Sequence, residues 1–290
     1  MKITNKHGLP ETIVNALKRP TYSKGGANLS VTELIDSPRL SQLKRAHADS
    51  LEQDASEMVW SLFGGAVHGL LEHGKADNHI IEERIHAEID GWHLSGAVDL
   101  QTVTEKGILI SDYKTTSAWA VMNTKSSWSE QLNIYAWLIE HVKQVPITGL
   151  EIIAIIRDWT RRDAESKEGY PRAPIVAIEI PLWSLADREA FVRTRLHLHA
   201  DAHLCATLKD DLPECSPSEM WEKPSSWAIK KPENVRATAV CYSEEEATKK
   251  IKDLGKGYVT VFRPGERTRC KSYCPVNQFC SQWAEYGREK

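Results

Sequence analysis

The sequence predicts an α/β protein in which a central mixed β-sheet is flanked by helices. Helical and strand-like segments follow one another in the order helix, three strands, helix, two strands, helix. The 290 residues are enough for one large domain or two small ones with a substantial core. The hydrophobic fraction of 41% and the charged fraction of 27% are close to the globular average, which excludes a disordered or fibrous chain.

The charge and hydropathy patterns exclude further classes of protein. The formal net charge is −3, so no global basic field attracts nucleic acid or a membrane, and a local patch must hold any such partner. No apolar run approaches the ~20 residues that span a bilayer, and the first residues lack the apolar segment of a secretion signal. We therefore expect a cytoplasmic protein without membrane contact, whose clustered cysteines bind metal rather than form disulfides.

The first elements are expected to be an arm and two helices. Residues 1–29 are polar and contain prolines and a glycine pair, which predicts an extended N-terminal arm. Ser30, with Glu33 three residues later, predicts a capping box that begins a helix over residues 31–46. Apolar residues near helical spacing predict a second helix over residues 52–73.

Strand-like segments occupy the centre of the chain. Strands are expected over residues 80–89, 92–100, 108–114, 149–157 and 174–182. The pair Asp90-Gly91 predicts a hairpin turn between the first two strands. Helices are expected over residues 130–143, capped by Ser129, and over residues 184–208.

The composition also indicates how the chain is divided. We expect residues 30–210 to form the core and residues 211–290 to form a C-terminal extension that carries a cysteine site. The extension begins with a proline-rich passage over residues 212–235, which we expect to cross the surface. A helix over residues 243–254 and a strand over residues 257–263 precede the cysteine segment.

The hairpin between the second and third predicted strands carries two aspartates. A turn centred between Glu105 and Lys106 places Asp99 opposite Asp112, with Cβ atoms roughly 5 Å apart. Alternation then places Lys114 on the same face as Asp112. Facing carboxylates are destabilising unless a cation lies between them, and a divalent cation with oxygen ligands meets that need. An acid two residues before a lysine also arises by chance roughly three times in such a chain. The hairpin alone therefore favours a metal site and a solvated salt-bridge face equally.

The order of motifs around this hairpin resembles a known nuclease family. Gln131 and Tyr135 lie one turn apart on one face of the following helix. The motifs, in chain order, are Gly64-x-x-x-His68, Asp99, Asp112-Tyr113-Lys114 and Gln131-x-x-x-Tyr135. This order resembles the RecB-type branch of the PD-(D/E)XK nuclease superfamily, which includes the RecB and AddB nuclease domains, the CRISPR adaptation nucleases and many phage exonucleases. Valine at position 98 and aspartate at position 112 depart from the superfamily's name, and both variations are tolerated there.

The resemblance implies a restriction-endonuclease-like core and a deoxyribonuclease that hydrolyses phosphodiester bonds with Mg²⁺ or Mn²⁺. The implied metal ligands are His68, Asp99, Asp112 and the backbone carbonyl of Tyr113. Lys114 is expected to position or help deprotonate the attacking water. Gln131 and Tyr135 are expected to orient Lys114 or the DNA backbone.

The resemblance further implies an exonuclease that acts on DNA in phage or prophage recombination or DNA processing, with a recombinase or annealing protein as partner. The alternative is a non-catalytic nucleic-acid-binding protein that keeps the nuclease fold and a structural cysteine-metal site. The charged triad of Asp99, Asp112 and Lys114 argues against this alternative, because a binding module has no use for these side chains on one face.

Three of the six cysteines, Cys270, Cys274 and Cys280, lie close together near the C-terminus. Three thiolates on a short loop are costly unless a metal compensates them. RecB-type nucleases often hold an iron–sulfur cluster with one distant cysteine and a C-terminal group of three. The resemblance thus implies a 4Fe-4S cluster, with zinc as second choice and a packed turn without metal as third. The expected fourth ligand is Cys215, with Cys241 the weaker candidate.

Overall fold

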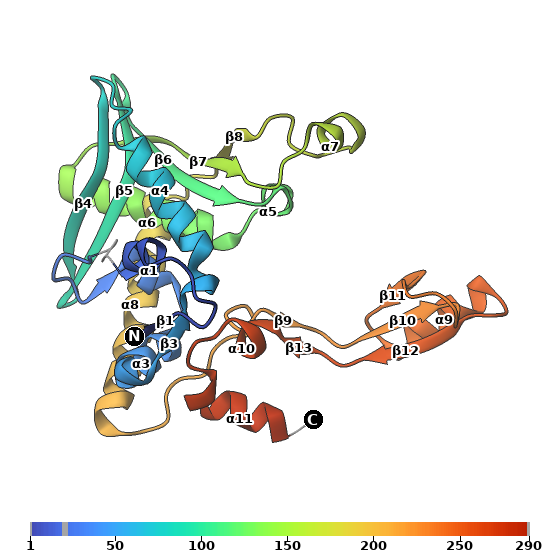
Figure 1. Ribbon diagram of the computed structural model, residues 1–290. Coiled ribbons are helices and arrows are strands. Elements are labelled where there is room, and N and C mark those ends of the chain that lie inside the picture. The colour runs from blue at the N-terminus through green and yellow to red at the C-terminus, as the bar shows by residue number, and fades with distance from the viewer. Residues whose placement is uncertain (1, 19–22, 289–290) are drawn as a thin grey trace.

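The structure is a computed structural model that describes residues 2–18 and 23–288. Its centre is a six-stranded sheet in the order β2-β5-β6-β7-β8, with β4 along the opposite side of β5 from β2 and β6 (Figure 1). The strands are β2 (Leu29–Ser30), β4 (His79–Ile89), β5 (Trp92–Thr104), β6 (Gly107–Thr116), β7 (Ile147–Ile156) and β8 (Ile175–Ile180). The pairs β2–β5 and β6–β7 are parallel and the others are antiparallel, so the predicted mixed sheet is confirmed.

Helices cover the sheet as the predicted fold class requires. The long helix α6 (Ser126–Lys143) packs against β4 and β7, and α2 (Val31–Ile35) and α8 (Leu185–Leu208) pack against α6. The main apolar core lies between this helical layer and the sheet and includes the fully buried Leu132, Leu138 and Ile110. Helix α4 (Val59–Leu71) contacts β6 on the other face, in front of the sheet in Figure 1. The core therefore fixes the strands from one face and leaves α4 on the other.

Local signals placed several elements correctly. Ser30 and Glu33 form the predicted capping box at the start of α2. The predicted helix over residues 31–46 is divided in two, because Pro38 begins a second helix, α3 (Pro38–Ala46), as its first residue. The predicted helix over residues 52–73 is wrong in its first third. That third forms strand β3 (Glu52–Asp54) and the 3₁₀ turn η2 (Ala55–Met58), and the short turn η1 (Ala48–Ser50) precedes β3.

The extended arm expected over residues 1–29 is wrong in its local structure. Strand β1 (Lys2–Thr4) pairs in parallel with β3, and helix α1 (Glu11–Lys18) follows. The Asp54 carboxylate explains this order, because it accepts hydrogen bonds from the Thr4 hydroxyl and the Lys6 amide. These contacts join residues about fifty positions apart, so no local sequence pattern could predict them. Pro20 and its neighbours at positions 19–22 lie outside the described residues.

The Ser129 cap predicted for α6 is also wrong. The helix begins one turn earlier, with Lys125 at the N-cap position and no side-chain capping bond. The loop before it holds α5 (Ala118–Met122), which Ser117 caps. The loop between β7 and β8 holds α7 (Arg161–Ser166), whereas α8 follows its predicted bounds closely.

The C-terminal extension has two parts. A ribbon of β9 (Glu222–Lys223) and β13 (Glu266–Arg267) leads to a small lobe that projects from the rest of the chain (Figure 1). The lobe consists of β10 (Ser226–Lys230), β11 (Ala239–Cys241), α9 (Glu244–Leu254) and β12 (Val259–Arg263). The chain then returns through α10 (Thr268–Ser272), η3 (Asn277–Phe279) and α11 (Ser281–Arg288) toward α3. Within the described residues, no helix combines the length and apolar character needed to cross a bilayer.

Candidate functional site

The pairing of β4 with β5 is interrupted at Glu82 and Asp99. The ladder pairs Ile81 with Leu100 and Glu83 with Val98, but it omits the pair between them. Glu82 has a φ angle of +50°, in the left-handed region that a residue with a side chain seldom adopts. Such a conformation persists only where surrounding contacts hold it, and it is concentrated at functional sites.

The interruption changes which residues of β5 face α6. A Cβ at Gly96 would meet the Tyr135 ring of α6, and Gln101 accepts a hydrogen bond from Lys143 of the same helix. In a regular strand, positions 96 and 101 face opposite sides of the sheet. The kink at Asp99 therefore lets the flanking parts of β5 pack on α6 while the Asp99 carboxylate contacts His68 of α4, at 3.7 Å.

Three side chains converge at this kink. The His68 Nδ1 atom lies 3.2 Å from Glu82 Oε1 and 3.7 Å from Asp99 Oδ1. One ligand atom from each of the three residues lies within 4.8 Å of the others, and no other such group of metal-binding side chains occurs in the described part of the chain. Two carboxylates and an imidazole thus share one point at the end of the acidic hairpin.

The peptide of Tyr113 joins this group to β6. Its N–H donates to Asp99 Oδ2 at 2.8 Å, and its carbonyl oxygen lies 3.2 Å from His68 Nε2. The ladder between β5 and β6 follows the predicted register, but it ends at the pair of Leu100 with Ser111. Beyond that pair, the Asp99 carboxylate accepts the hydrogen bond of the Tyr113 amide, in place of a backbone carbonyl from β5.

The predicted residues of β6 and α6 form a second, adjoining group. The Lys114 ammonium lies 2.5 Å from Asp112 Oδ2. Gln131 donates to Asp112 Oδ1 at 3.1 Å and contacts the Tyr135 hydroxyl at 2.9 Å. Asp112 is almost fully buried, and its Oδ2 atom has no hydrogen bond of good geometry within the described residues besides the Lys114 contact. The Lys114 ammonium is therefore the one charge that balances this oxygen among the described residues.

Electrostatics shows that the site is short of positive charge. Burial, together with the nearby charge of Asp112, raises the pKa of Asp99 to about 7, against the opposing effects of His68 and Lys114. The hydrogen bond with Glu82 raises the pKa of His68, helped by the charges of Asp99 and Glu82. In this structure the site thus favours bound protons. A divalent cation with oxygen and imidazole ligands would supply the same charge.

The donor set therefore fits a hard divalent cation. His68, Glu82 and Asp99 supply three ligand atoms in one place, and the Tyr113 carbonyl lies beside them. Asp112 lies in the adjoining group with Lys114 rather than among the three, although its charge acts on Asp99. The roles assigned to these residues from the sequence stay predictions, since the structure reports their placement only.

Glu82 is the site residue that the sequence interpretation missed. Counting outward from the predicted Asp90-Gly91 turn pairs residue 82 with Asp99, in the same way that the next turn pairs Asp99 with Asp112. The signal was thus present in the register of the first hairpin. The left-handed backbone of Glu82, which aims its carboxylate at His68, is not visible in any local pattern.

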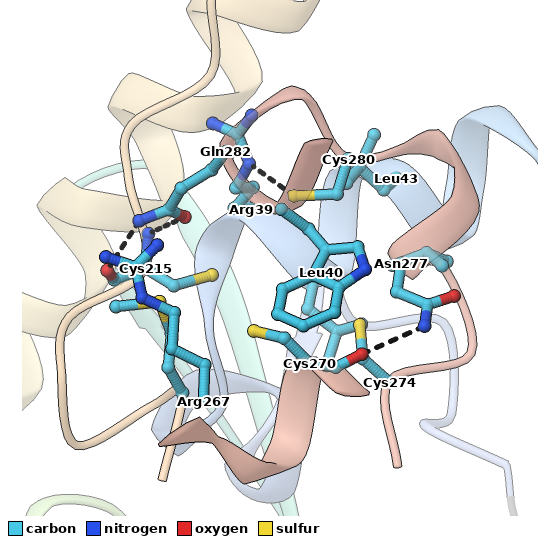
Figure 2. A pocket seen from close by; sticks show the side chains of 13 residues that line it. Arg39, Leu40, Leu43, Cys215, Arg267, Cys270, Cys274, Asn277, Cys280 and Gln282 are labelled. Atoms are coloured by element: carbon cyan, nitrogen blue, oxygen red, sulfur yellow. Dashed lines mark hydrogen bonds between the residues drawn. The ribbon is translucent and has the colours of Figure 1, made fainter. Parts of the chain in front are cut away.

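Four cysteines from two parts of the extension line one cavity against α3 (Figure 2). They are Cys215, Cys270, Cys274 and Cys280. Gln282 fixes the first of them, since its side chain accepts from the Cys215 amide at 2.9 Å and donates to the Cys215 carbonyl at 3.1 Å. Arg39 of α3, almost fully buried, donates from Nε to the Cys280 sulfur at 3.3 Å.

Burial makes the charged thiolate form costly in the cysteine cavity. Burial raises the pKa of Cys215 to about 11, and burial also raises the pKa of Cys270 and Cys274. Sulfurs around one zinc ion, each at about 2.3 Å, lie only about 3.8 Å apart. In the described chain no three cysteine sulfurs come within 4.8 Å of one another, which is wider than that spacing.

The other two cysteines lie elsewhere. Cys241 is buried in the small core of the C-terminal lobe, and Cys205 lies on α8. Neither lines the cavity. Of the two candidates for a fourth cysteine, the structure therefore brings Cys215 and not Cys241 to the C-terminal group.

Comparison with known proteins gives the family. The structure of the protein SSO0001 is 16% identical with a TM-score of 0.45, and the match covers 72% of this chain and 96% of that one. A protein of Eubacterium rectale named "putative exonuclease" is 12% identical with a TM-score of 0.29, over 64% of this chain and 70% of that one. No curated protein sequence matches the chain. The family model of the PD-(D/E)XK nuclease superfamily matches residues 29–281, from β2 to the start of α11. This chain therefore belongs to the PD-(D/E)XK nuclease superfamily.

Proposed function

We propose that this protein is a deoxyribonuclease that depends on Mg²⁺ or Mn²⁺ and degrades DNA as an exonuclease. The observation that carries the proposal is the connected group of His68, Glu82 and Asp99 beside the ion pair of Asp112 with Lys114. Such a group joins a place for a cation to a partly exposed ammonium, and both charges can stabilise the transition state of phosphodiester hydrolysis.

The residues divide into holding and positioning roles. His68, Glu82, Asp99, Asp112 and the Tyr113 carbonyl would hold the metal. When bound, the metal polarises the scissile phosphate and lowers the pKa of a bound water. Glu82 orients the His68 ring by contact with Nδ1, so that its Nε2 atom faces the Tyr113 carbonyl.

Lys114 is the residue that can act on the nucleophile. Its side chain is 26% exposed, whereas Asp112 beside it is 1% exposed, so the ammonium reaches the edge of the site while its partner stays inside. There it can orient an attacking water and offset negative charge that develops on the phosphate. Gln131, held by Asp112 and Tyr135, keeps the Asp112 carboxylate in place.

Cleavage of linear DNA by the purified protein tests this assignment. We expect degradation with Mg²⁺ or Mn²⁺, none with EDTA, and loss of activity in Asp112→Asn and Lys114→Gln. Glu165 and Lys167 supply a matched control, because they form the other acid-x-Lys motif in the chain and lie on the exposed helix α7 and at its end. Glu165→Gln and Lys167→Gln should cleave normally. DNA binding without cleavage would favour the non-catalytic alternative.

The choice of exonuclease rests on the motif order shared with RecB-type nucleases. Covalently closed circular DNA should resist an enzyme that needs an end, whereas its linearised form should be degraded. Equal cleavage of both forms would contradict the exonuclease assignment. The same resemblance supports a cytoplasmic role in phage or prophage recombination or DNA processing, with a recombinase or annealing protein as partner. Capture of such a protein by the purified nuclease tests that part.

We further propose that Cys215, Cys270, Cys274 and Cys280 hold a 4Fe-4S cluster. The four cysteines line one cavity, and no three of their sulfurs lie within 4.8 Å of one another, which supports a cluster over a single zinc ion. Protein purified without oxygen should be brown, absorb near roughly 400 nm and contain iron. Cys215→Ser should remove the colour and Cys241→Ser should keep it. If the purified protein contained zinc and no iron, the proposal of a 4Fe-4S cluster would be overturned.

A further inference from the structure

The C-terminal lobe over residues 226–263 has a core of its own. Ile229 and Cys241 on one face of its sheet are buried against Ala247 of α9. Trp227 and Ile251 pack around them. The lobe thus buries its apolar residues on the side that faces α9. Figure 1 shows the lobe at the end of the β9–β13 ribbon, away from the nuclease core.

The opposite face of the lobe's sheet is exposed on its two outer strands, β11 and β12, while Ala228 on the central strand is fully buried. Ala228 pairs with Val240 on one side and with Val261 on the other, so these three side chains form a row across the face. Val240 is 43% exposed and Val261 is 39% exposed. Tyr242, which follows β11 on the same face by alternation, is 67% exposed. An apolar row with an exposed aromatic ring therefore faces away from α9.

The charges on this outer face have one sign. Alternation along β10 and β12 places Lys230 and Arg263 on the same face as Ala228 and Val261. Neither cation forms an ion pair with any described residue, and β10, β11 and β12 contain no acidic residue. The acidic residues Glu244–Glu246 begin α9 on the other layer, where the Glu246 carboxylate accepts a hydrogen bond from the Tyr242 backbone amide at 3.0 Å.

We propose that the outer face of this lobe binds single-stranded DNA. Phosphates meet Lys230 and Arg263, and a base stacks on Tyr242 beside the valine row. A duplex would present only its polar backbone to this flat face and leave the valines and the ring against phosphate, whereas an unpaired strand offers bases to both. The cations also disfavour a basic protein partner. The inference rests on the proposed function only in taking DNA as the ligand.

The test measures binding and not cleavage. Anisotropy of a labelled single strand is recorded with the full-length protein in buffer without divalent metal, over a series of salt concentrations. The double variant Lys230→Glu/Arg263→Glu should bind about tenfold more weakly and lower the salt slope by about 1.4, since each lost phosphate contact on a single strand accounts for about 0.7. Tyr242→Ala should weaken single-strand binding about fivefold and duplex binding less.

A control with the same change in charge comes from the other layer of the lobe. Lys249 and Lys252 are exposed on α9, so Lys249→Glu/Lys252→Glu should leave affinity and slope almost unchanged. The proposal would be overturned if both double variants weakened DNA binding equally, or if neither weakened it. It would also be overturned if the outer face captured a protein partner that DNA does not displace. If this chain bound DNA through the outer face but did not cleave it, only the nuclease assignment would be contradicted.

Discussion

Asp99 is a carboxyl group in a place that opposes its charge. Its side chain is about 10% exposed, and the Asp112 carboxylate adds negative potential. A bound proton or a bound cation would neutralise this charge beyond what His68 and Lys114 supply. A raised pKa at Asp99 is what the proposed cation site would show without its metal, and it makes the stability of the protein depend on pH.

Stability of the metal-free protein should fall as pH rises from about 4 to about 7. Over that window the folded state keeps the Asp99 proton that the unfolded chain has released, so the folded state binds more protons and the free energy of unfolding decreases with pH. The loss is at most about 4 kcal/mol, at about 1.4 kcal/mol per pKa unit. His68, whose pKa is also raised, extends the decline to higher pH. Urea unfolding at several pH values measures this decline. If the free energy of unfolding of Asp99→Asn fell with pH as steeply as that of the natural protein, the assignment to Asp99 would be contradicted.

Glu82 should prove necessary for metal affinity. Glu82→Gln removes one carboxylate charge from the group of three and leaves only a neutral amide oxygen to accept from His68. We expect at least a roughly tenfold higher Mn²⁺ requirement, with activity partly restored at high metal. Glu88, exposed on the same strand, provides the control: Glu88→Gln should need no additional metal. A metal titration of cleavage separates the two variants.

At the scale of elements, the site depends on how closely α6 approaches β5. A Cβ at Gly96 would lie 2.7 Å from the Tyr135 ring and 2.9 Å from Leu138 and Val31. Only glycine permits this contact, which positions the helix that carries Gln131. Gly69 on α4, by contrast, borders open space, since a Cβ at that position would meet no atom within 4 Å.

Alanine at these two glycines should therefore have opposite effects. Gly96→Ala should destabilise the protein by about 1–3 kcal/mol through overpacking and should lower activity by displacing α6. Gly69→Ala should stabilise α4 by up to about 1 kcal/mol. Urea unfolding compares both with the natural protein. Tolerance of alanine at position 96 would mean that α6 has freedom that the structure does not show.

At the scale of the molecule, one arginine ties the extension to the core. Arg39 of α3 donates to the Leu212 carbonyl at 2.5 Å and to the Ser281 hydroxyl at 2.6 Å, in addition to its contact with the Cys280 sulfur. It is 5% exposed, so its charge is held almost entirely by these acceptors. The family match from β2 to α11 agrees with an extension that is part of the nuclease.

Loss of this arginine should release the extension before the core unfolds. Arg39→Met removes three donor nitrogens that contact partly buried or exposed acceptors, and Arg39→Lys cannot restore the planar guanidinium. We expect about 2–4 kcal/mol lower stability and early proteolytic cleavage near residues 209–215 in both variants. Arg45 is an exposed arginine on the same helix, α3, and serves as the control. The Arg45→Met variant should be cleaved by protease at the same rate as the natural protein. Mass spectrometry of the fragments identifies the cut.

Sequence alone was sufficient where a structure is encoded by neighbouring residues. The Ser30–Glu33 capping box, the Asp90-Gly91 turn and the register from Leu100 to Thr104 each depend on contacts within a short stretch of chain. Steric and hydrogen-bonding preferences of that kind act before any tertiary contact forms. The order of motifs was likewise enough to indicate the nuclease family.

Tertiary structure alone decided which side chains meet. The left-handed turn of Glu82 toward His68, the arm residues held by Asp54, and the choice of Cys215 over Cys241 all join segments far apart in the chain. Position and burial, rather than residue type, set the charge balance of Asp99 and the exposure of the lobe's outer face. These properties arise because folding fixes distances that no local pattern contains, and charge and desolvation depend on those distances.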